Sequence, residues 1–410
     1  MEEWKEYKLG EVCKSIADGD HMPPPKTDKG IPFVTISNIV GNRLDFANTH
    51  FVPQSYYDDL DDKRRPHIGD TIYSVVGTFG KPVYVNEEKP FVFQRHIAIL
   101  RPDNSMIVPQ FLFYTLLSPQ FYRKADVMAI GAVQRTISLT SLRNVTIQLP
   151  SLDIQSKIVG MLSSLDNKIE VNRRINENLE QQAQALFKSW FVDFEPFKDQ
   201  PFVESELGMI PQGWKVGTFL DNINVMPGGT PSTGVEEYWK DGDIPFFSPK
   251  DVNGVYCFET EKRITEKGLK NCSSHLYPKD TLFITARGTV GKLALAGVPM
   301  AMNQSNYALV AKEGIGKYYL YLLAQTMVAV LLKKANGAVF SAITTKDFNE
   351  PTLVLSQSVL ERFEKIITPL FDKIYETSKE SRRLAELRDT LLPRLMSGEL
   401  KVNDLENNEI

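Results

Sequence analysis

The chain has 410 residues, of which 42% are hydrophobic and 24% are charged, and its formal net charge is −4. These values are typical of a soluble globular protein, and they exclude a strongly basic chain that binds nucleic acid through its overall charge. Basic and acidic residues are nearly balanced in 1–150 and in 206–355, and the acidic excess lies in 151–205 and 356–410. Because the chain is too long for one ordinary core, we expect more than one domain.

The first residues and the cysteines indicate where the protein works. The N-terminal sequence MEEWKEYKLG is acidic and amphipathic, unlike a signal peptide. The three cysteines, Cys13, Cys257 and Cys272, are odd in number and lack the spacing of a metal site, which favours a reducing, cytoplasmic environment. The longest apolar run, 318–332, is too short to span a bilayer comfortably, so we expect a buried helix there and a counterpart at 111–121.

One phrase occurs twice, as DTIYSVVGTFGK at 70–81 and as DTLFITARGTVGK at 280–292. A phosphate-binding P-loop requires G-x-x-x-x-G-K-[ST], because its first glycine opens the loop and its final hydroxyl holds magnesium. Other residues stand at those two positions: Val75 and Pro82 in the first copy, Ala286 and Leu293 in the second. The pattern favours a β-branched strand that enters a tight glycine turn and leaves it as a second strand.

Further echoes follow in the same order, which indicates a duplicated domain. They are WK at 4–5 and 214–215, IPF at 31–33 and 244–246, Gln94 and Gln304, and GAVQRTISLTSL at 131–142 with GAVFSAITTKDF at 337–348. Each copy is rich in predicted strands and has one apolar helix near its end. We therefore predict an α+β fold with two similar domains, each built around a twisted, mostly antiparallel sheet.

A long segment without internal Gly-Pro punctuation follows each copy, and in both segments the residues at 4-3-4-3 spacing form a seam. The first seam comprises Ile158, Leu162, Leu165, Ile169, Asn172, Asn176, Leu179, Ala183, Leu186 and Trp190; the second comprises Phe363, Ile367, Leu370, Ile374, Thr377, Ser381, Leu384, Arg388, Leu391 and Leu395. Both are polar at the same two steps. Two long helices that pair antiparallel about a pseudo-two-fold axis would bring these steps together, whereas independent core helices would not require the match.

The predicted organisation has five parts. These are a first domain at 1–150, a helical region at 151–200, a second domain at 201–355, a second helical region at 356–400 that pairs with the first, and a tail at 401–410. The two domains would be separated by the antiparallel coiled-coil helices.

The sequence shows no catalytic constellation. The five histidines are scattered, and zinc-protease, C-x-x-C, G-x-S-x-G, dinucleotide-binding and adenine-methylation motifs are missing. Charged runs such as Asp61-Asp62 and Lys63-Arg64-Arg65 are interpreted as solvated surface, although the basic run would suit a nucleic-acid phosphate. We expect no metal site, and a duplicated protein with a rigid spacer favours recognition over catalysis.

Four stretches resemble the specificity subunit of type I restriction-modification systems. They are LFKSWFVDFEPF at 186–197, SELGMIPQGW at 205–214, GGTPSTGVEEYWKDGDIPFFSPKDV at 228–252 and LLPRLMSGEL at 391–400. The resemblance covers nearly the whole chain. The first domain departs from it, because it has ADGDHMPPPKTDKG at 17–30 in place of the Gly-Gly-Thr-Pro phrase.

The resemblance implies a non-catalytic, sequence-specific DNA-binding subunit. Each domain would be a target-recognition domain that reads one half of an asymmetric, bipartite site on double-stranded DNA. The helices would set the spacer and dock two adenine methyltransferase subunits, which carry S-adenosylmethionine, and restriction subunits with translocase and nuclease activity would join them. This chain would bind no cofactor and no membrane.

Direct readout of bases uses arginine or lysine on guanine and asparagine or glutamine on adenine. The echoed loops of the first domain offer Thr78, Lys81, Gln94, Arg95, His96, Gln134 and Arg135; those of the second offer Lys250, Arg287, Thr289, Lys292, Asn303, Gln304, Ser305 and Asn306. Two alternatives stay open. One is a coiled-coil adaptor whose domains bind protein, and the other is an enzyme that uses the Gly-Thr-x-Gly-Lys turns on a phosphorylated substrate.

Overall fold

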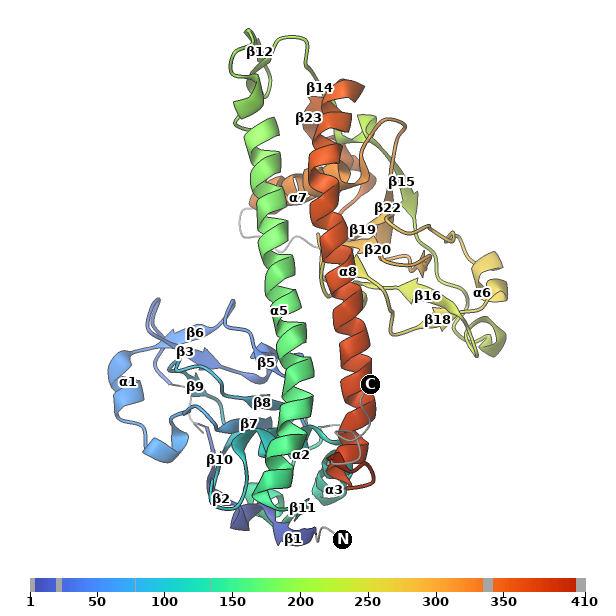
Figure 1. The fold of residues 1–410 in the computed structure, drawn as a ribbon. Coiled ribbons are helices and arrows are strands. Elements are labelled where there is room, and N and C mark those ends of the chain that lie inside the picture. The colour runs from blue at the N-terminus through green and yellow to red at the C-terminus, as the bar shows by residue number, and fades with distance from the viewer. Residues whose placement is uncertain (1–3, 20–23, 78, 133, 335–341, 403–410) are drawn as a thin grey trace. The chain divides into compact units, whose positions relative to one another are not determined.

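The computed structural model describes residues 4–19, 24–77, 79–132, 134–334 and 342–402. The chain divides into two compact units, Met1–Lys168 with Leu384–Ile410, and Ile169–Arg383. Two helices of 40 residues each, α5 (Leu152–Phe191) and α8 (Gln357–Met396), contribute to both units and are the green and red rods of Figure 1.

The first unit contains several small sheets. The largest is antiparallel, with the order β2 (Cys13–Asp18), β10 (Ile97–Pro102), β7 (Thr71–Ser74), β8 (Pro82–Tyr84). The others are β6 (His50–Val52), β3 (Ile31–Val34), β9 (Val92–Phe93); β1 (Lys5–Lys8) with β11 (Thr146–Leu149); and β4 (Ile39–Val40) with β5 (Arg43–Leu44). Its short helices are α1 (Gln54–Asp58), α2 (Pro109–Leu117), α3 (Pro119–Met128) and α4 (Leu139–Asn144).

The second unit repeats this plan. Its largest sheet has the order β15 (Ile223–Pro227), β22 (Asn306–Ala311), β19 (Leu282–Thr285), β20 (Leu293–Ala296), β17 (Tyr256–Cys257). The smaller sheets are β18 (Arg263–Ile264), β16 (Ile244–Phe247), β21 (Ala301–Met302); β14 (Lys215–Thr218) with β23 (Pro351–Val354); and β12 (Phe202–Ser205) with β13 (Gly208–Pro211). Its helices are α6 (Glu266–Lys270) and α7 (Lys317–Lys334).

Most strands of the two units correspond, which confirms the predicted α+β fold with an internal repeat. The order β2-β10-β7-β8 corresponds to β15-β22-β19-β20, and the order β6-β3-β9 corresponds to β18-β16-β21. Each of these three-stranded sheets also contains one parallel pair, β3 with β9 in the first unit and β16 with β21 in the second. Strands β7 and β19 lie inside their sheets, and all of their residues are buried.

The apolar helix of each unit is formed differently. The run 318–332 lies within α7 and packs into the core of the second unit. Its expected counterpart at 111–121 is not one helix, because the chain breaks at Ser118 between α2 and α3. Pro119 explains the break: it lacks an amide donor and holds Ser118 extended, with ψ of 142°. No helix among the described residues has the length and apolar character needed to cross a membrane.

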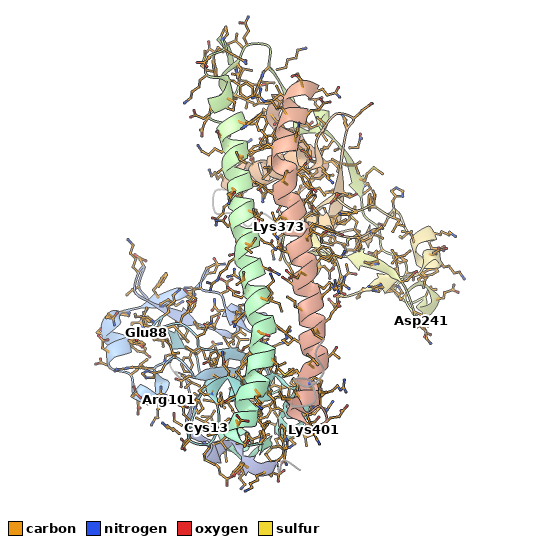
Figure 2. The ribbon with its side chains drawn as sticks, viewed as in Figure 1. Cys13, Glu88, Arg101, Asp241, Lys373 and Lys401 are labelled. Atoms are coloured by element: carbon orange, nitrogen blue, oxygen red, sulfur yellow. The ribbon has the colours of Figure 1, made fainter. Side chains whose placement is uncertain are left out.

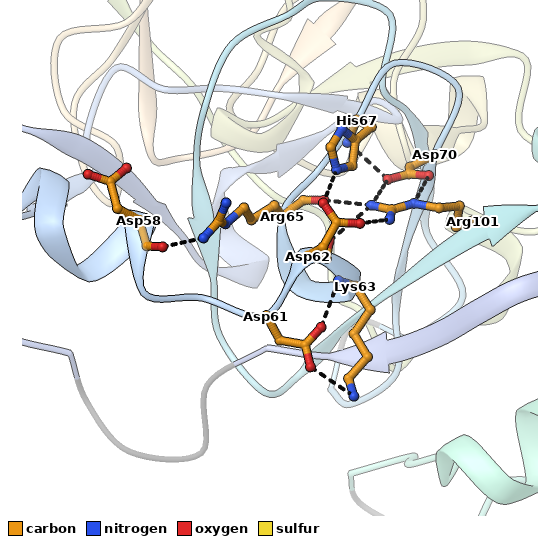
Figure 3. Close-up of polar contacts among 8 residues, drawn as sticks. All are labelled: Asp58, Asp61, Asp62, Lys63, Arg65, His67, Asp70 and Arg101. Atoms are coloured by element: carbon orange, nitrogen blue, oxygen red, sulfur yellow. Dashed lines mark hydrogen bonds and ion pairs between the residues drawn. The ribbon is translucent and has the colours of Figure 1, made fainter.

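A half-buried arginine fastens a loop to the sheet of the first unit. Arg101 of β10 lies 2.6 Å from the Asp62 carboxylate and 3.2 Å from that of Asp70, which is 2% exposed (Figure 3). His67 also contacts Asp62, at 2.9 Å. The hydrogen bond from Arg101 lowers the pKa of the Asp62 carboxyl most, and the hydrogen bond from His67 lowers it further. The Asp62 side chain is 68% exposed, which confirms its interpretation as solvated surface, and its pairing with Arg101 also anchors the loop 61–70.

The long helices pair antiparallel, as the seam predicts. In the second unit Asn172 of α5 lies against Thr377 of α8, whereas Phe187 lies against Phe363, with ring centroids 6.2 Å apart. In the first unit the Asp166 carboxylate of α5 accepts from Arg388 of α8 at 2.8 Å. Every predicted seam residue is buried or half-buried. The buried face of α8 is wider than the seam, because Phe371 stacks on Tyr318 of α7 at 4.3 Å.

Three of the four polar seam residues meet, as expected for the paired helices, whereas the hydroxyl of the fourth, Ser381, donates to the main-chain oxygen of Thr377 within α8 at 2.8 Å. The Asn172 amide donates to the Glu380 carboxylate at 2.8 Å and to the main-chain oxygen of Thr377 at 3.4 Å. Asn176 donates to the Ser378 hydroxyl at 3.0 Å and accepts from the Thr377 hydroxyl. The Oδ1 atom of Asn172 is buried without a hydrogen-bond partner among the described residues. Such a layer specifies register and lowers stability.

Replacing this layer with leucine should stabilise the helix pair. We expect the double variant Asn172→Leu, Asn176→Leu to melt a few degrees higher, because it removes a buried unsatisfied oxygen and adds apolar contact. Thermal unfolding followed by circular dichroism measures the change. The control is Asn167→Leu, the same substitution at an exposed position of α5. A clear fall in the melting temperature of the double variant would contradict this role of the asparagines.

Candidate functional site

The two Gly-Thr-x-Gly-Lys phrases form the same closed turn. In the first unit the Lys81 amide donates to the Ser74 hydroxyl at 2.8 Å, and the Gly80 amide donates to the Ser74 main-chain oxygen at 3.0 Å. In the second unit the Lys292 amide donates to the Thr285 hydroxyl at 2.9 Å, and the Gly291 amide donates to the Thr285 main-chain oxygen at 2.8 Å. These amides are bonded within the turn, so they are not available to cradle a phosphate.

The second glycine of each turn permits close packing on a helix. Gly80 and Gly291 have φ of 86° and 84°. A Cβ atom on Gly80 would lie 2.6 Å from the Tyr122 ring of α3, and one on Gly291 would lie 2.7 Å from Val328 of α7. Beyond the turn the lysine side chains are exposed, as is Thr289. Thr78 lies outside the described residues.

A second turn, before β10 or β22, lies beside each glycine turn. Ser74 pairs with Ile97 in the first unit, and Thr285 pairs with Asn306 in the second. This register shifts the predicted match of Gln94 with Gln304 by one residue. Gln94 corresponds to Asn303, and the exposed Arg95 corresponds to the exposed Gln304.

The corrected register removes one candidate. Asn306 stands where the first unit has the buried Ile97, and it is itself 1% exposed. Its amide donates to the Asn303 side chain at 2.7 Å, and Asn303 also accepts from the Ser305 amide at 2.9 Å. Asn306 faces the interior and Asn303 shapes the turn, so the prediction that Asn306 lies on an exposed loop is wrong.

Arg95 and Gln304, at equivalent positions, are supported differently. The Arg95 Nε atom donates to His96 Nε2 at 3.4 Å. Burial, and then the charge of Arg95, lowers the pKa of His96, so this imidazole is neutral near pH 7. Gln304 accepts a hydrogen bond from the Thr230 hydroxyl through its Oε1 atom.

Thr230 belongs to the Gly-Gly-Thr-Pro phrase, whose glycines allow two chain segments to touch. A Cβ atom on Gly228 would lie 2.0 Å from the main-chain oxygen of Asn303. The first unit has an equivalent in Gly19, whose Cβ atom would lie 2.0 Å from the main-chain oxygen of Phe93. The Gly19 amide donates to the main-chain oxygen of Ile97 at 3.2 Å, and the Gly228 amide donates to the main-chain oxygen of Asn306 at 3.3 Å. Sequence comparison missed Gly19 because the residues around it differ.

A third segment, after α3 in the first unit, completes the arrangement. Thr136 forms isolated bridges with both Val76 and Ile130. Gln134 is exposed, and its Nε2 atom would lie 3.7 Å from a Cβ atom on Gly77. Arg135 instead points back to α3, where it pairs with Asp126 at 2.7 Å. The matching residues Phe340 and Ser341 lie outside the described residues.

The structure therefore gathers most candidates at one place in each unit. We call this place the variable edge and define it by side chains at the tips of the three segments: Val76, Lys81, Gln94, Arg95, His96, Ile130, Gln134 and Thr136 in the first unit, and Arg287, Thr289, Lys292, Gln304, Ser305 and Ala342 in the second. Lys250 is separate from this set and pairs with Glu261 at 3.5 Å. Figure 2 shows how densely side chains cover both units.

The chemistry of the variable edges is that of recognition. They offer amides, guanidinium groups and ammonium groups, which donate to planar polar groups. The thiols of the half-buried Cys13 and the buried Cys257 are unsuited to nucleophilic attack, because desolvation raises the pKa of each to about 12.

Comparison with known proteins gives a consistent result. A profile of the family described as "Type I restriction modification DNA specificity domain" matches residues 1–181 and 211–378. The chain is 26% identical to the type I restriction enzyme HindI specificity subunit of Haemophilus influenzae, over 98% of this chain and 100% of that protein. It is 30% identical to the MjaIX specificity subunit of Methanocaldococcus jannaschii, over 73% and 71%. A solved S subunit of a type I restriction-modification system from M. genitalium shares the fold, with a TM-score of 0.54 at 16% identity and coverage of 96% of each chain.

The close approach at Gly228 gives a test of the second edge. We expect Gly228→Ala to lower stability by roughly 1–3 kcal/mol, because the added methyl group overlaps the main chain of Asn303. Gly234→Ala is the matched control, since nothing lies within 4 Å of its Cβ position. Thermal melting compares them, and equal melting temperatures would show that the two segments are not in contact.

Proposed function

Because the chain belongs to the family of type I restriction-modification DNA specificity domains, we propose that each of its two domains reads one half of an asymmetric, bipartite DNA site. The two variable edges would carry this readout. They have the same backbone and different side chains, as the pair Arg95 and Gln304 shows. Arginine suits guanine and glutamine suits adenine, so two such edges recognise two different half-sites.

We propose that the chain acts without catalytic activity of its own, in a complex. Two methyltransferase subunits carrying S-adenosylmethionine would dock on the long helices, and restriction subunits would join them. The names of the relatives, specificity subunits of restriction enzymes, support such partners. Apolar residues on the helix surfaces offer contact area, since Val171 of α5 is 49% exposed and Ile366 of α8 is 43% exposed. The three free thiols suit a complex that works in the cytoplasm.

The two alternative functions have less support. A phosphate-binding enzyme would need the turn amides, which are bonded to Ser74 and Thr285. A protein-binding adaptor does not require two variable edges with equivalent backbones and different side chains. The family assignment does not favour an adaptor either. A titration of the chain with ATP should therefore show no binding.

Single substitutions at the equivalent position should affect opposite halves of the DNA site. We expect Gln304→Ala to relax recognition in one half-site and Arg95→Ala to relax it in the other, each costing ~1–3 kcal/mol of discrimination. Sequencing of methylated adenines in genomic DNA treated with the methyltransferase complex measures this. If both variants keep full stringency, or both relax the same half-site, the proposed assignment of one domain to each half-site is wrong.

The helices should determine the distance between the half-sites. Seven residues inserted in each helix, between Lys168 and Ile169 and between Arg383 and Leu384, lengthen it by about 10.5 Å at ~1.5 Å per residue and retain the seam. At ~3.4 Å per base pair, we expect a spacer longer by about three base pairs and unchanged half-sites. The control inserts seven residues in α5 alone. The helices then cannot keep the pairing of Asn172 with Thr377 and the pairing of Asp166 with Arg388 together, which should abolish specific methylation. A changed half-site with an unchanged spacer would contradict the proposal.

A further inference from the structure

One backbone position differs in chemical character between the two variable edges. It is the residue before the first glycine of each turn, Val76 in the first unit and Arg287 in the second. Val76 forms a bridge with Thr136, and Arg287 forms the same bridge with Ala342. The neighbouring main-chain hydrogen bonds are also equivalent in the two units. The Ile137 amide donates to the Val75 oxygen at 3.0 Å, and the Ile343 amide donates to the Ala286 oxygen at 2.9 Å. The backbone is thus held alike while the side chain changes from apolar to cationic.

The first unit presents methyl groups at this position. Thr136 is bridged to Val76 on one side and to Ile130 on the other. Side chains of directly paired antiparallel residues lie on the same face, so the three form a strip of methyl-bearing side chains. Val76 and Thr136 are half-buried, and Ile130 is 73% exposed. The strip lies beside Gln134, a candidate reader.

The second unit presents a free cation there. Arg287 is exposed, and its guanidinium forms no hydrogen bond or ion pair with the described part of the chain. Its bridge partner Ala342 is small and leaves the guanidinium accessible. By contrast, Arg135 of the first edge is committed to Asp126 at 2.7 Å. Arg287 is therefore available to an external acceptor.

We propose that this position determines specificity in both domains, with Val76, Ile130 and Thr136 contacting the 5-methyl group of a thymine and Arg287 donating to the O6 and N7 atoms of a guanine. The inference rests on the proposed function and names the base chemistry of each edge. In the major groove only thymine presents a methyl group, and an arginine fork matches the two acceptors of guanine. A phosphate contact by Arg287 is the competing role, and it would carry no sequence information.

Base analogues test the two contacts atom by atom. The half-sites are first mapped by methylation sequencing with the methyltransferase complex, and the Arg95→Ala and Gln304→Ala variants assign each half-site to its domain. Duplexes then carry uracil for each thymine of the first half-site, which removes the 5-methyl group, or 7-deazaguanine for each guanine of the second, which removes the N7 acceptor. We expect one uracil to weaken binding several-fold and one 7-deazaguanine to weaken it about 5- to 150-fold.

Variants connect each analogue to its side chain. In the triple variant Val76→Ala, Ile130→Ala, Thr136→Ser, uracil should no longer weaken binding, and in Arg287→Ala, 7-deazaguanine should no longer weaken it. The matched control is Arg263→Ala, an exposed arginine that bonds to the main chain of Asp243, and in it both analogues should still weaken binding. These differences do not arise if the side chains are merely structural, because a structural loss weakens natural and substituted duplexes alike.

The outcomes separate the two levels of the argument. If the complex methylates no defined site, the proposed function is wrong and this inference falls with it. If a site is mapped but no uracil or 7-deazaguanine has an effect, the assignment is wrong and the proposed function stands. If Arg287→Ala weakens binding equally on all sequences and lowers its salt dependence, Arg287 contacts a phosphate and the guanine assignment is overturned.

Discussion

A buried hydroxyl group in each domain holds the turn on which the variable edge depends. Ser74 and Thr285 are fully buried, and each accepts from the amide of the lysine seven residues later. Because the turn bonds its own amides to this strand, its shape does not require any particular side chain at the tip. Positions such as Val76 and Arg287 can therefore differ while the scaffold stays the same. A recognition domain needs this separation if its target is to change without a change of fold.

The helix pair follows the opposite rule, because there the side chains fix the geometry. Leucine at every step would permit the pair to slide by a heptad, whereas Asn172 and Asn176 find their partners in one register. The unsatisfied oxygen of Asn172 is the stability cost of that choice. A protein whose helices set a distance gains more from a defined register than from maximal stability.

Local signals made much of this fold predictable from the sequence. The duplicated phrase, the strand patterns and the 4-3-4-3 seam depend on residues close together in the chain, and the structure confirms them. Most errors arose where distant segments meet. The break at Ser118 is the exception, because the neighbouring Pro119 signals it locally. The one-residue shift at Asn303 depends on strand pairing. Gly19 was missed because its role is a contact with Phe93, and the role of Arg135 is fixed by Asp126.

The charges of the domains bear on how the chain meets DNA. Affinity for any duplex rises with the number of phosphates that basic residues neutralise. Two arginines of the first unit are already committed to its own carboxylates: Arg101 pairs with Asp62 and Asp70, and Arg135 pairs with Asp126. From its net charge of −4 and this internal pairing, we expect the chain to have little affinity for DNA of arbitrary sequence. We therefore expect base contacts at the variable edges to supply discrimination, and basic surfaces of the methyltransferase subunits to supply most of the binding energy. Selectivity benefits from this division, because a subunit that adheres weakly to random DNA is not retained at wrong sites.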